Sequence, residues 1–265
     1  MNIVLFEEEE LSRPLPPTDR RATHITDILR LGPGGEFRAG VVDGAAGIGR
    51  VRRIDPEGRV EIELELGSRD GGRGGPNNTP PLHQVRLLLG HPRPIVLKRM
   101  LRDLSTLGVE RIVVVRTELG EKSYLESKIW QGDTVRRLLI EGAEQAGSTV
   151  LPLVDRAWSL EAAAETVSSG LEEAERVLFD NEVPDAEVPV GRPAGLLAQP
   201  RGAEGVSAAC GRICAVGSER GWTDAERVVL AKLGFGVRNL GRRVLRTETA
   251  AIAAVSISVG EMEYW

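Results

Sequence analysis

Apolar and polar positions alternate with period two in the first quarter of the chain. Residues 60–66 place apolar and acidic side chains in turn, which is typical of a half-buried strand. Asp43 and Gly44 interrupt the apolar pattern of residues 41–51 and predict a hairpin turn between short strands. A short helix is expected over residues 24–30. Together these elements predict a small β-barrel of about 70 residues.

The pattern then changes to helices that alternate with continuous apolar strands. Apolar side chains recur at helical spacing from Leu97 to Leu107 and stop at Gly108, and residues 112–115 read as a buried strand. The same reasoning predicts a helix from Asp133 to about Gln145, an extended segment over 149–154, a helix from Ser159, and strands over 176–179, 195–198 and 213–216. This alternation indicates an α/β fold with a parallel sheet that helices cover on both faces.

Two helix starts are expected near the end of the chain. Residues 223–226 form a capping box, so a helix should begin just after Gly221 and end before Gly234. Thr247 should open a last helix that is apolar on every side. Such a helix must be buried, either in the core or against a second subunit.

A segment rich in glycine, proline and asparagine separates the two patterns. Residues 68–81 can neither bury apolar surface nor hold regular structure, so they are expected to be a linker. The predicted domains are therefore a β-barrel over residues 1–67 and an α/β domain over residues 82–265.

Composition and charge narrow the class of protein. The chain has 265 residues, of which 41% are hydrophobic, enough for sizeable cores. Its net charge of -5 argues against a protein that coats nucleic acid non-specifically, because that mode needs a broad cationic surface. Basic side chains still cluster over residues 93–102 and 238–246, as solvated faces or as local binding patches.

The sequence predicts a cytoplasmic protein without a metal site. Residues 1–6 run into four glutamates and lack the basic start of a signal peptide, and no apolar run reaches the roughly 20 residues of a membrane span. Cys210 and Cys214 are expected to be reduced core thiols. The three histidines are scattered, so a histidine metal centre is not expected.

Two loops near the end of the chain carry the candidate chemistry. Gly217 and Gly221 bracket a turn from a strand into a helix, at the carboxyl end of a parallel strand, where open α/β sheets bind ligands. On local grounds this turn is either a ligand site or a connector. A companion loop over residues 240–246 also leaves a strand and enters a buried helix, which favours the ligand site.

The order of these motifs resembles the RsmE-like small-subunit ribosomal RNA uracil-N3-methyltransferases of the SPOUT superfamily. The most specific match is Leu-Arg-Thr-Glu-Thr-Ala-Ala over residues 245–251, preceded by the Gly-x-Glu-x-Gly turn over residues 217–221. Motifs around His24 and over residues 141–147 extend the resemblance to nearly the whole chain. It implies an N-terminal PUA-like barrel and a C-terminal SPOUT domain with a trefoil knot.

The resemblance implies S-adenosylmethionine as the cofactor, held by the backbone of three loops. The first loop is either residues 179–182 or residues 197–198, the second is residues 217–221, and the third is residues 240–245. The implied cofactor-binding residues are Leu197, Gly217, Ser218, Glu219, Gly221, Leu240, Gly241, Val244, Leu245 and Thr249.

The implied reaction needs a cation and a proton acceptor. The neutral N3 of uracil is a poor nucleophile, so its proton must be lost. Arg246 is the candidate either for stabilising the anion that develops on the base or for gripping the nucleotide's phosphate. Glu248 or Glu219 is the candidate proton acceptor, and the alternative for Glu248 is a carboxylate that only complements the helix dipole.

The implied partner is ribosomal RNA or the small ribosomal subunit, and the apolar last helix suits a homodimer interface. The residues expected to hold RNA are His24, Arg30, Arg93, Lys98, Arg99 and Arg246. The chain departs from the family turn, Gly-Pro-Glu-Gly-Gly, at Ser218 and Arg220. Two alternatives therefore stay open: an RNA-binding relative that has lost catalysis, and a SPOUT methyltransferase for another RNA position.

Overall fold

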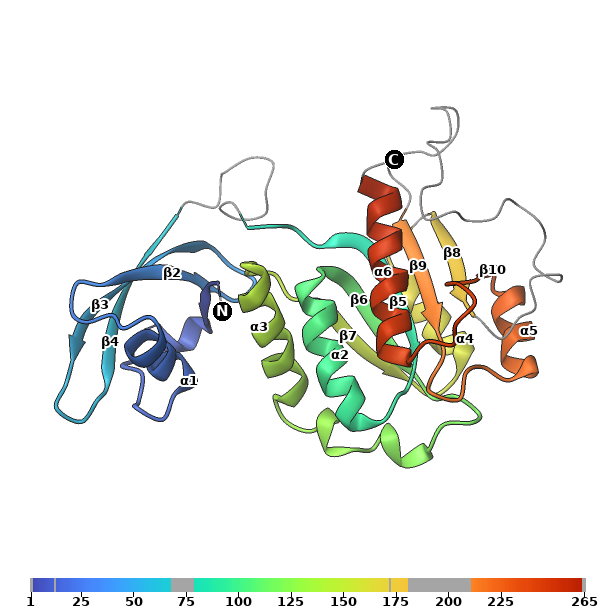
Figure 1. The fold of residues 1–265 in the computed structure, drawn as a ribbon, viewed down its shortest axis with the longest axis horizontal. Coiled ribbons are helices and arrows are strands. Elements are labelled where there is room, and N and C mark those ends of the chain that lie inside the picture. Colours follow the sequence, from blue (N-terminus) through green and yellow to red (C-terminus); the bar gives the residue numbers. More distant parts are fainter. Residues whose placement is uncertain (1, 12, 68–78, 172, 181–210, 264–265) are drawn as a thin grey trace. The chain divides into compact units, whose positions relative to one another are not determined.

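The computed structural model describes residues 2–11, 13–67, 79–171, 173–180 and 211–263 (Figure 1). The chain divides into two compact units. The first contains Met1–Leu82 together with Arg137–Leu151, and the second contains His83–Arg136 together with Pro152–Trp265. Each unit is built around its own sheet, of four strands in the first and six in the second.

The first sheet has the strand order β1-β2-β3-β4. Its strands are β1 (Val4–Phe6), β2 (Glu36–Val41), β3 (Ala46–Ile54) and β4 (Val60–Leu66). Strand β1 runs parallel to β2, and the other pairs are antiparallel. The predicted strand over 60–66 and the turn at Asp43 are confirmed, and Asp43 adopts a positive φ of 55°. This sheet is the part of the predicted barrel that the described residues show.

The predicted helix over residues 24–30 begins earlier and ends earlier than expected. Helix α1 (Arg20–Thr23) continues into the π-helical turn η2 (His24–Ile28). The start is set by Asp19, whose side chain accepts a hydrogen bond from the backbone N–H of Arg21 at 2.8 Å. Arg30 lies beyond the helix in the left-handed region, with φ 55°.

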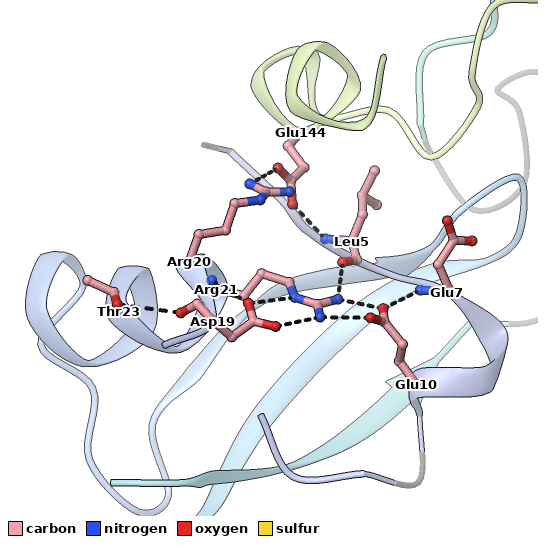
Figure 2. A network of polar contacts seen from close by, with 8 residues as sticks. All are labelled: Leu5, Glu7, Glu10, Asp19, Arg20, Arg21, Thr23 and Glu144. Atoms are coloured by element: carbon pink, nitrogen blue, oxygen red, sulfur yellow. Dashed lines mark hydrogen bonds and ion pairs between the residues drawn. The ribbon is translucent and has the colours of Figure 1, made fainter. Parts of the chain in front are cut away.

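Arg21 is the centre of a polar network in the first unit (Figure 2). Its nearly buried guanidinium pairs with Glu10 at 2.6 Å and with Asp19 at 2.8 Å, and it donates to the carbonyl of Leu5 at 3.2 Å. The hydrogen bond from Arg21 lowers the pKa of Glu10; burial raises the pKa of Asp19, but hydrogen bonds from Arg21 outweigh it, so that pKa also falls. The network joins α1 to strand β1.

Glu144 is one of the residues that join helix α3 (Thr134–Ala146) to the first unit. The side chain of Glu144 is buried, and the bounds of α3 confirm the predicted helix. One carboxylate oxygen accepts the backbone N–H of Leu5 at 3.1 Å, and the other pairs with Arg20 at 2.6 Å (Figure 2). The helix is thereby fastened to strand β1.

The second sheet is parallel throughout and has the order β10-β8-β9-β5-β6-β7. This confirms the predicted α/β class. Its strands are β5 (His83–Gly90), β6 (Val109–Val115), β7 (Leu153–Ala157), β8 (Ala174–Phe179), β9 (Gly211–Val216) and β10 (Gly236–Arg238). The predicted strand over 195–198 lies outside the described residues.

The expected extended segment over residues 149–154 is displaced to β7. Its first residues instead bond within the first unit, where Thr149 donates to the carbonyl of Gly44 at 2.9 Å and the N–H of Leu151 donates to Asp43 at 2.9 Å. The carbonyl of Thr149 also accepts the N–H of Asp43 at 2.7 Å, so the backbone of this segment is bonded to the first unit and the strand starts only at Leu153.

Helices cover both faces of the second sheet (Figure 1). Helices α4 (Leu160–Ser168) and α5 (Asp224–Lys232) share an apolar cluster with Leu88 of β5. Helices α2 (Pro94–Thr106) and α6 (Thr247–Glu263) lie on the other face, where the thiol of Cys214 lies 3.0 Å from the hydroxyl of Ser258. Among the described helices, none is long and apolar enough to cross a membrane.

The structure refines the expectations for the last helix and for the cysteines. Helix α6 buries Ala251, Ala254 and Val255, whereas Ile252 is only half-buried. Cys214 is a free, buried thiol in the core, as predicted, and burial raises its pKa to about 11, which keeps it protonated. Cys210 lies outside the described residues.

Candidate functional site

The candidate site lies at the carboxyl edge of the parallel sheet. Strands β5, β6 and β9 pair in register up to Gly90, Val115 and Val216, so the loops that follow them leave the sheet at one edge. Strands β8 and β10 end at the same edge. This is the position at which open α/β sheets bind ligands, as the sequence predicts for residues 217–221.

The turn after β9 is tightly packed on the end of β5. The N–H of Gly221 donates to the carbonyl of Ser218 at 3.0 Å, and Gly221 has a φ of 68°, which favours glycine. A Cβ atom on Gly90 would lie 2.5 Å from the backbone nitrogen of Ser218. A Cβ atom on Gly217 would lie 3.0 Å from the backbone of Gly221. The turn therefore depends on glycine both inside it and on the strand beneath it.

The two residues that depart from the family turn fit this geometry. Ser218 is buried, and its hydroxyl lies 3.4 Å from the hydroxyl of Thr117 in the loop after β6. Arg220 is exposed and donates to the carbonyl of Leu119 in the same loop at 3.3 Å. Neither side chain disrupts the hydrogen bond that closes the turn.

Glu219 contacts the start of helix α2. Its carboxylate accepts the backbone N–H of Arg93 at 2.9 Å, and Arg93 is the residue that precedes the first turn of α2. The carboxylate thus lies at the amino end of helix α2, where it accepts an N–H that has no partner within the helix. The structure brings together two residues for which the sequence predicts separate roles, cofactor binding for Glu219 and RNA binding for Arg93.

The predicted capping box of α5 is confirmed and also fixes a neighbouring loop. The hydroxyl of Thr223 accepts the N–H of Glu226 at 3.2 Å, and the carboxylate of Glu226 accepts the N–H of Thr223 at 2.8 Å. The second oxygen of this buried carboxylate accepts the N–H of Glu118 at 2.8 Å. Glu226 therefore ties the loop after β6 to the turn after β9.

The companion loop between β10 and α6 is far more exposed. Asn239 accepts the N–H of Gly241 at 2.6 Å, whereas the side chain of Val244 is 86% exposed. The carbonyl of Arg246 accepts the N–H of Ala250 at 2.8 Å and so begins α6, while its side chain is exposed. The remaining predicted residues here are half-buried or exposed: Leu240, Leu245, Glu248 and Thr249.

The first predicted cofactor loop is described only in part. Asp180 follows β8, is buried, and its carboxylate pairs with Arg227 of α5 at 2.7 Å. Its backbone N–H donates to the carbonyl of Arg238 at 3.1 Å. Leu197 and residues 181–182 lie outside the described residues. Asp180 thus joins the end of β8 to helix α5 and to β10, at the edge where the first predicted loop leaves the sheet.

The predicted RNA-binding residues fall into two sets. His24 and Arg30 belong to the first unit, where His24 lines a pocket of about 220 Å³ with Phe37 and Arg38. Burial lowers the pKa of His24, so its imidazole is largely neutral at pH 7. In the second unit, the candidate cations on and before α2 are all exposed, namely Arg93, Lys98 and Arg99.

Sequence reasoning missed a cluster of ring side chains beside the turn. His91 follows β5 directly, and Tyr124 and Trp130 belong to the 3-10 turns η3 (Lys122–Tyr124) and η4 (Lys128–Trp130). The available signal was Gly-His-Pro immediately after an apolar strand. Elsewhere, no group of His, Cys, Asp or Glu side chains in the described part of the chain is arranged to hold a metal ion.

Comparisons with known proteins give the relationship of this chain to others. A family model described as an RNA methyltransferase domain matches residues 78–259. The chain is 36% identical to "Ribosomal RNA small subunit methyltransferase E" of Treponema pallidum (strain Nichols), over 100% of this chain and 93% of the relative. It is 26% identical to "Ribosomal RNA small subunit methyltransferase E 1" of Borreliella burgdorferi, over 99% of both chains.

A solved structure shows the same fold. The ribosomal RNA small subunit methyltransferase E of Neisseria gonorrhoeae, bound to S-adenosyl methionine, matches with a TM-score of 0.65 and 22% identity, over 97% of this chain and 95% of that chain. The agreement covers both units. With the family match and the full-length relative, it follows that this chain belongs to the ribosomal RNA small subunit methyltransferase E family and carries its RNA methyltransferase domain.

Proposed function

We propose that this protein transfers a methyl group from S-adenosylmethionine to N3 of a specific uridine in the small-subunit (16S) ribosomal RNA. The observation that carries the proposal is the tight glycine turn over residues 217–221, at the carboxyl edge of the sheet, in a chain of this family. The names of the full-length relatives support the RNA substrate. The bound S-adenosyl methionine of the Neisseria gonorrhoeae structure supports the cofactor.

The residues at the edge fit this cofactor. S-adenosylmethionine has no phosphate, so it needs close backbone and apolar surface rather than a cationic cradle or a metal. The turn offers backbone that packs too closely for a Cβ atom, and the companion loop offers the exposed side chain of Val244. When bound, the cofactor supplies an electrophilic methyl group. The residues proposed to hold it are Leu197, Gly217, Ser218, Glu219, Gly221, Leu240, Gly241, Val244, Leu245 and Thr249.

Arg246 and Glu248 are proposed to act on the base. The exposed guanidinium of Arg246, at the entry to α6, stabilises the anion that develops on uracil or grips its phosphate. One carboxylate oxygen of Glu219 already accepts the N–H of Arg93 at 2.9 Å, so it is occupied within the protein. Glu248 is therefore the favoured acceptor of the N3 proton.

The finer features of the fold belong to the same proposal. Residues 1–67 form a PUA-like RNA-binding barrel, and the loops around residues 217–221 and 240–246 belong to a trefoil knot. Helix α6, in which Ile252 is half-buried beside the buried face, supplies a homodimer interface. We infer a cytoplasmic location from the proposed ribosomal RNA substrate. A sedimentation profile that shows only monomer would remove the dimer from the proposal.

The RNA contacts are tested by charge removal in each unit. Arg30→Ala and Arg99→Ala should each raise the dissociation constant for ribosomal RNA without changing the affinity for S-adenosylmethionine, because both side chains are exposed and remote from the turn in sequence. Unchanged RNA affinity in both variants contradicts these assignments.

Calorimetric titration with S-adenosylmethionine tests the function itself. Saturable binding to one site per chain is expected. A relative that kept RNA binding but lost catalysis should bind the cofactor weakly or not at all, so the absence of a binding heat would favour that alternative. Transfer to another nucleotide would instead identify a methyltransferase for a different RNA position.

A further inference from the structure

Three ring side chains meet on loops that leave the carboxyl edge of the second sheet. The ring centroids of His91 and Tyr124 are 5.7 Å apart. The rings of His91 and Trp130 are 5.8 Å apart and meet edge to face. These are the spacings at which aromatic pairs attract one another. We call His91, Tyr124 and Trp130 the ring cluster.

Hydrogen bonds fix the orientation of His91 and Trp130. The indole N–H of Trp130 donates to Nε2 of His91 at 3.1 Å, so that nitrogen carries no proton. Nδ1 of His91 therefore carries the proton and donates to the carbonyl of Pro92 at 2.6 Å. Burial lowers the pKa of His91, which keeps the imidazole neutral. His91 thus orients the indole and is not available as a base.

The cluster is attached to the proposed cofactor turn on two sides. His91 follows Gly90, on which the turn packs, and precedes Arg93, whose N–H binds Glu219. The loop that carries the other two rings also contains Thr117, whose hydroxyl lies 3.4 Å from the hydroxyl of Ser218. Short, packed segments therefore connect the rings to the proposed site of methyl transfer.

The outer rings remain partly exposed and carry a stacked cation. Tyr124 and Trp130 are half-buried, so each of these large aromatic side chains leaves part of its surface exposed to solvent. The guanidinium of exposed Arg156 lies 5.8 Å from the centroid of the Trp130 ring and donates to the carbonyl of Leu125 at 2.6 Å. A flat aromatic and a flat cation held at the rim of a site are the groups on which unpaired nucleobases stack.

We propose that Tyr124, Trp130 and Arg156 form a stacking site for an unpaired base of the RNA next to the methylated nucleotide. The inference rests on the proposed function and assigns these three residues to binding of its RNA substrate. The same loop carries the exposed acids Glu121 and Glu126 beside its lysines, so net charge does not explain binding here. Stacking carries the affinity, and His91 serves as a positioning residue for the Trp130 ring.

Binding of a fluorescein-labelled oligouridylate, followed by anisotropy, tests the inference. Trp130→Ala should weaken binding about 5-fold to 100-fold, the effect of losing one base–aromatic stack. Arg156→Ala, at an exposed position, should weaken it about 3-fold to 10-fold. Leu153→Ala is the matched control, because Leu153 is also exposed on β7 but lies at the amino end of that strand. It should leave binding unchanged.

A second readout separates contact from structural support. Addition of the oligouridylate should quench tryptophan fluorescence in the wild type. Trp130→Phe keeps a ring, so it should retain RNA affinity within about threefold while most of the quenching disappears. Quenching that persists in Trp130→Phe, or RNA affinity that stays within about twofold in both Trp130→Ala and Arg156→Ala, overturns the inference. A wild-type protein that leaves the probe unbound overturns it as well.

The outcomes also distinguish this inference from the proposed function. Calorimetry with S-adenosylmethionine should give wild-type affinity for Trp130→Ala, which shows that the variant is folded. Methyl transfer to ribosomal RNA by Trp130→Ala with an unchanged KM for RNA would reject the stacking site and keep the function. RNA binding through the ring cluster without any methyl transfer by the wild type would keep the stacking site and reject the function.

Discussion

The two loops that frame the proposed cofactor site are held in opposite ways. The turn over residues 217–221 packs on Gly90 and bonds to two neighbouring loops. The loop between β10 and α6 leaves Val244 86% exposed and presents the side chain of Arg246 to solvent. Packing and hydrogen bonds hold the first loop in place as a fixed wall of the site, whereas Val244 and Arg246 of the second loop are exposed to solvent.

This difference indicates that the turn over residues 217–221 shapes the site, whereas exposed side chains of the companion loop are available to bind ligands. Ser218 and Arg220 depart from the family pattern, yet the turn keeps its closing hydrogen bond, because its geometry is set by glycine packing. Within the specific family match over residues 245–251, Thr247 and Ala251 are buried, whereas Arg246 and Thr249 are exposed and contribute little to the core. We therefore assign the exposed side chains of the companion loop to ligand binding, which single substitutions can test.

The largest effect is expected for Arg246→Ala. If the guanidinium stabilises charge that develops on the base, kcat for methyl transfer should fall about 10²-fold to 10³-fold while S-adenosylmethionine binds normally. Arg242→Ala provides the control, since Arg242 is an exposed arginine of the same loop. Equal losses in the two variants would mean that only the charge of the loop matters.

Gly90→Ala should damage the fixed wall. The new methyl would lie 2.5 Å from the backbone of Ser218, so the turn must move. We expect the free energy of unfolding to fall by about 1–3 kcal/mol and the affinity for S-adenosylmethionine to fall by about tenfold. In Gly32→Ala, where the methyl meets nothing within 4 Å, both quantities should stay unchanged. Denaturant unfolding and calorimetry measure both quantities, and normal affinity in Gly90→Ala would show that the turn is not a wall of the site.

Val244→Ser should affect binding without affecting stability. The side chain of Val244 buries little surface in the free protein, but burying it under a ligand is worth about 1.5 kcal/mol, so the affinity for S-adenosylmethionine should fall about tenfold. Val228→Ser, at a valine of α5 that is 52% exposed, should change neither quantity. A loss of stability in Val244→Ser with normal affinity would assign the loop to the fold.

The smallest effect is expected for Arg220→Gly, which restores the family residue. Arg220 is exposed and makes one hydrogen bond, to the carbonyl of Leu119, so the affinity for S-adenosylmethionine should stay within about twofold of wild type. A gain of tenfold or more would mean that this arginine obstructs the site, and the two walls would then differ less than the packing indicates.

The sequence predicts those parts of the fold that depend on neighbouring residues. The alternation in β4, the capping box at Thr223 and the helix end at Gly108 are all local signals, and all are confirmed. Strand β5 was missed because Arg86 interrupts its apolar run; this arginine is buried, and Glu110 and the carbonyl of Val167 bind it. Such partners lie far away in the sequence and leave no local pattern.

The site shows the same division. The turn over residues 217–221 was predictable, because a glycine pair between a strand and a helix start is a local pattern. Its contact with Arg93 joins residues 126 positions apart, and the bond from Trp130 to His91 joins residues 39 positions apart. These contacts arise only when the strands align in the sheet, so no local pattern in the sequence predicts them.

Nucleoside analysis of methylated RNA shows whether this protein methylates N3 of one uridine. The purified protein would be incubated with S-adenosylmethionine and with small ribosomal subunits or their RNA, and the RNA would then be digested and resolved by mass spectrometry. We expect N3-methyluridine at one position, formed by the wild type and strongly reduced in Arg246→Ala. An unmodified RNA despite cofactor binding, or a methyl group on a different atom or base, would contradict the proposed function.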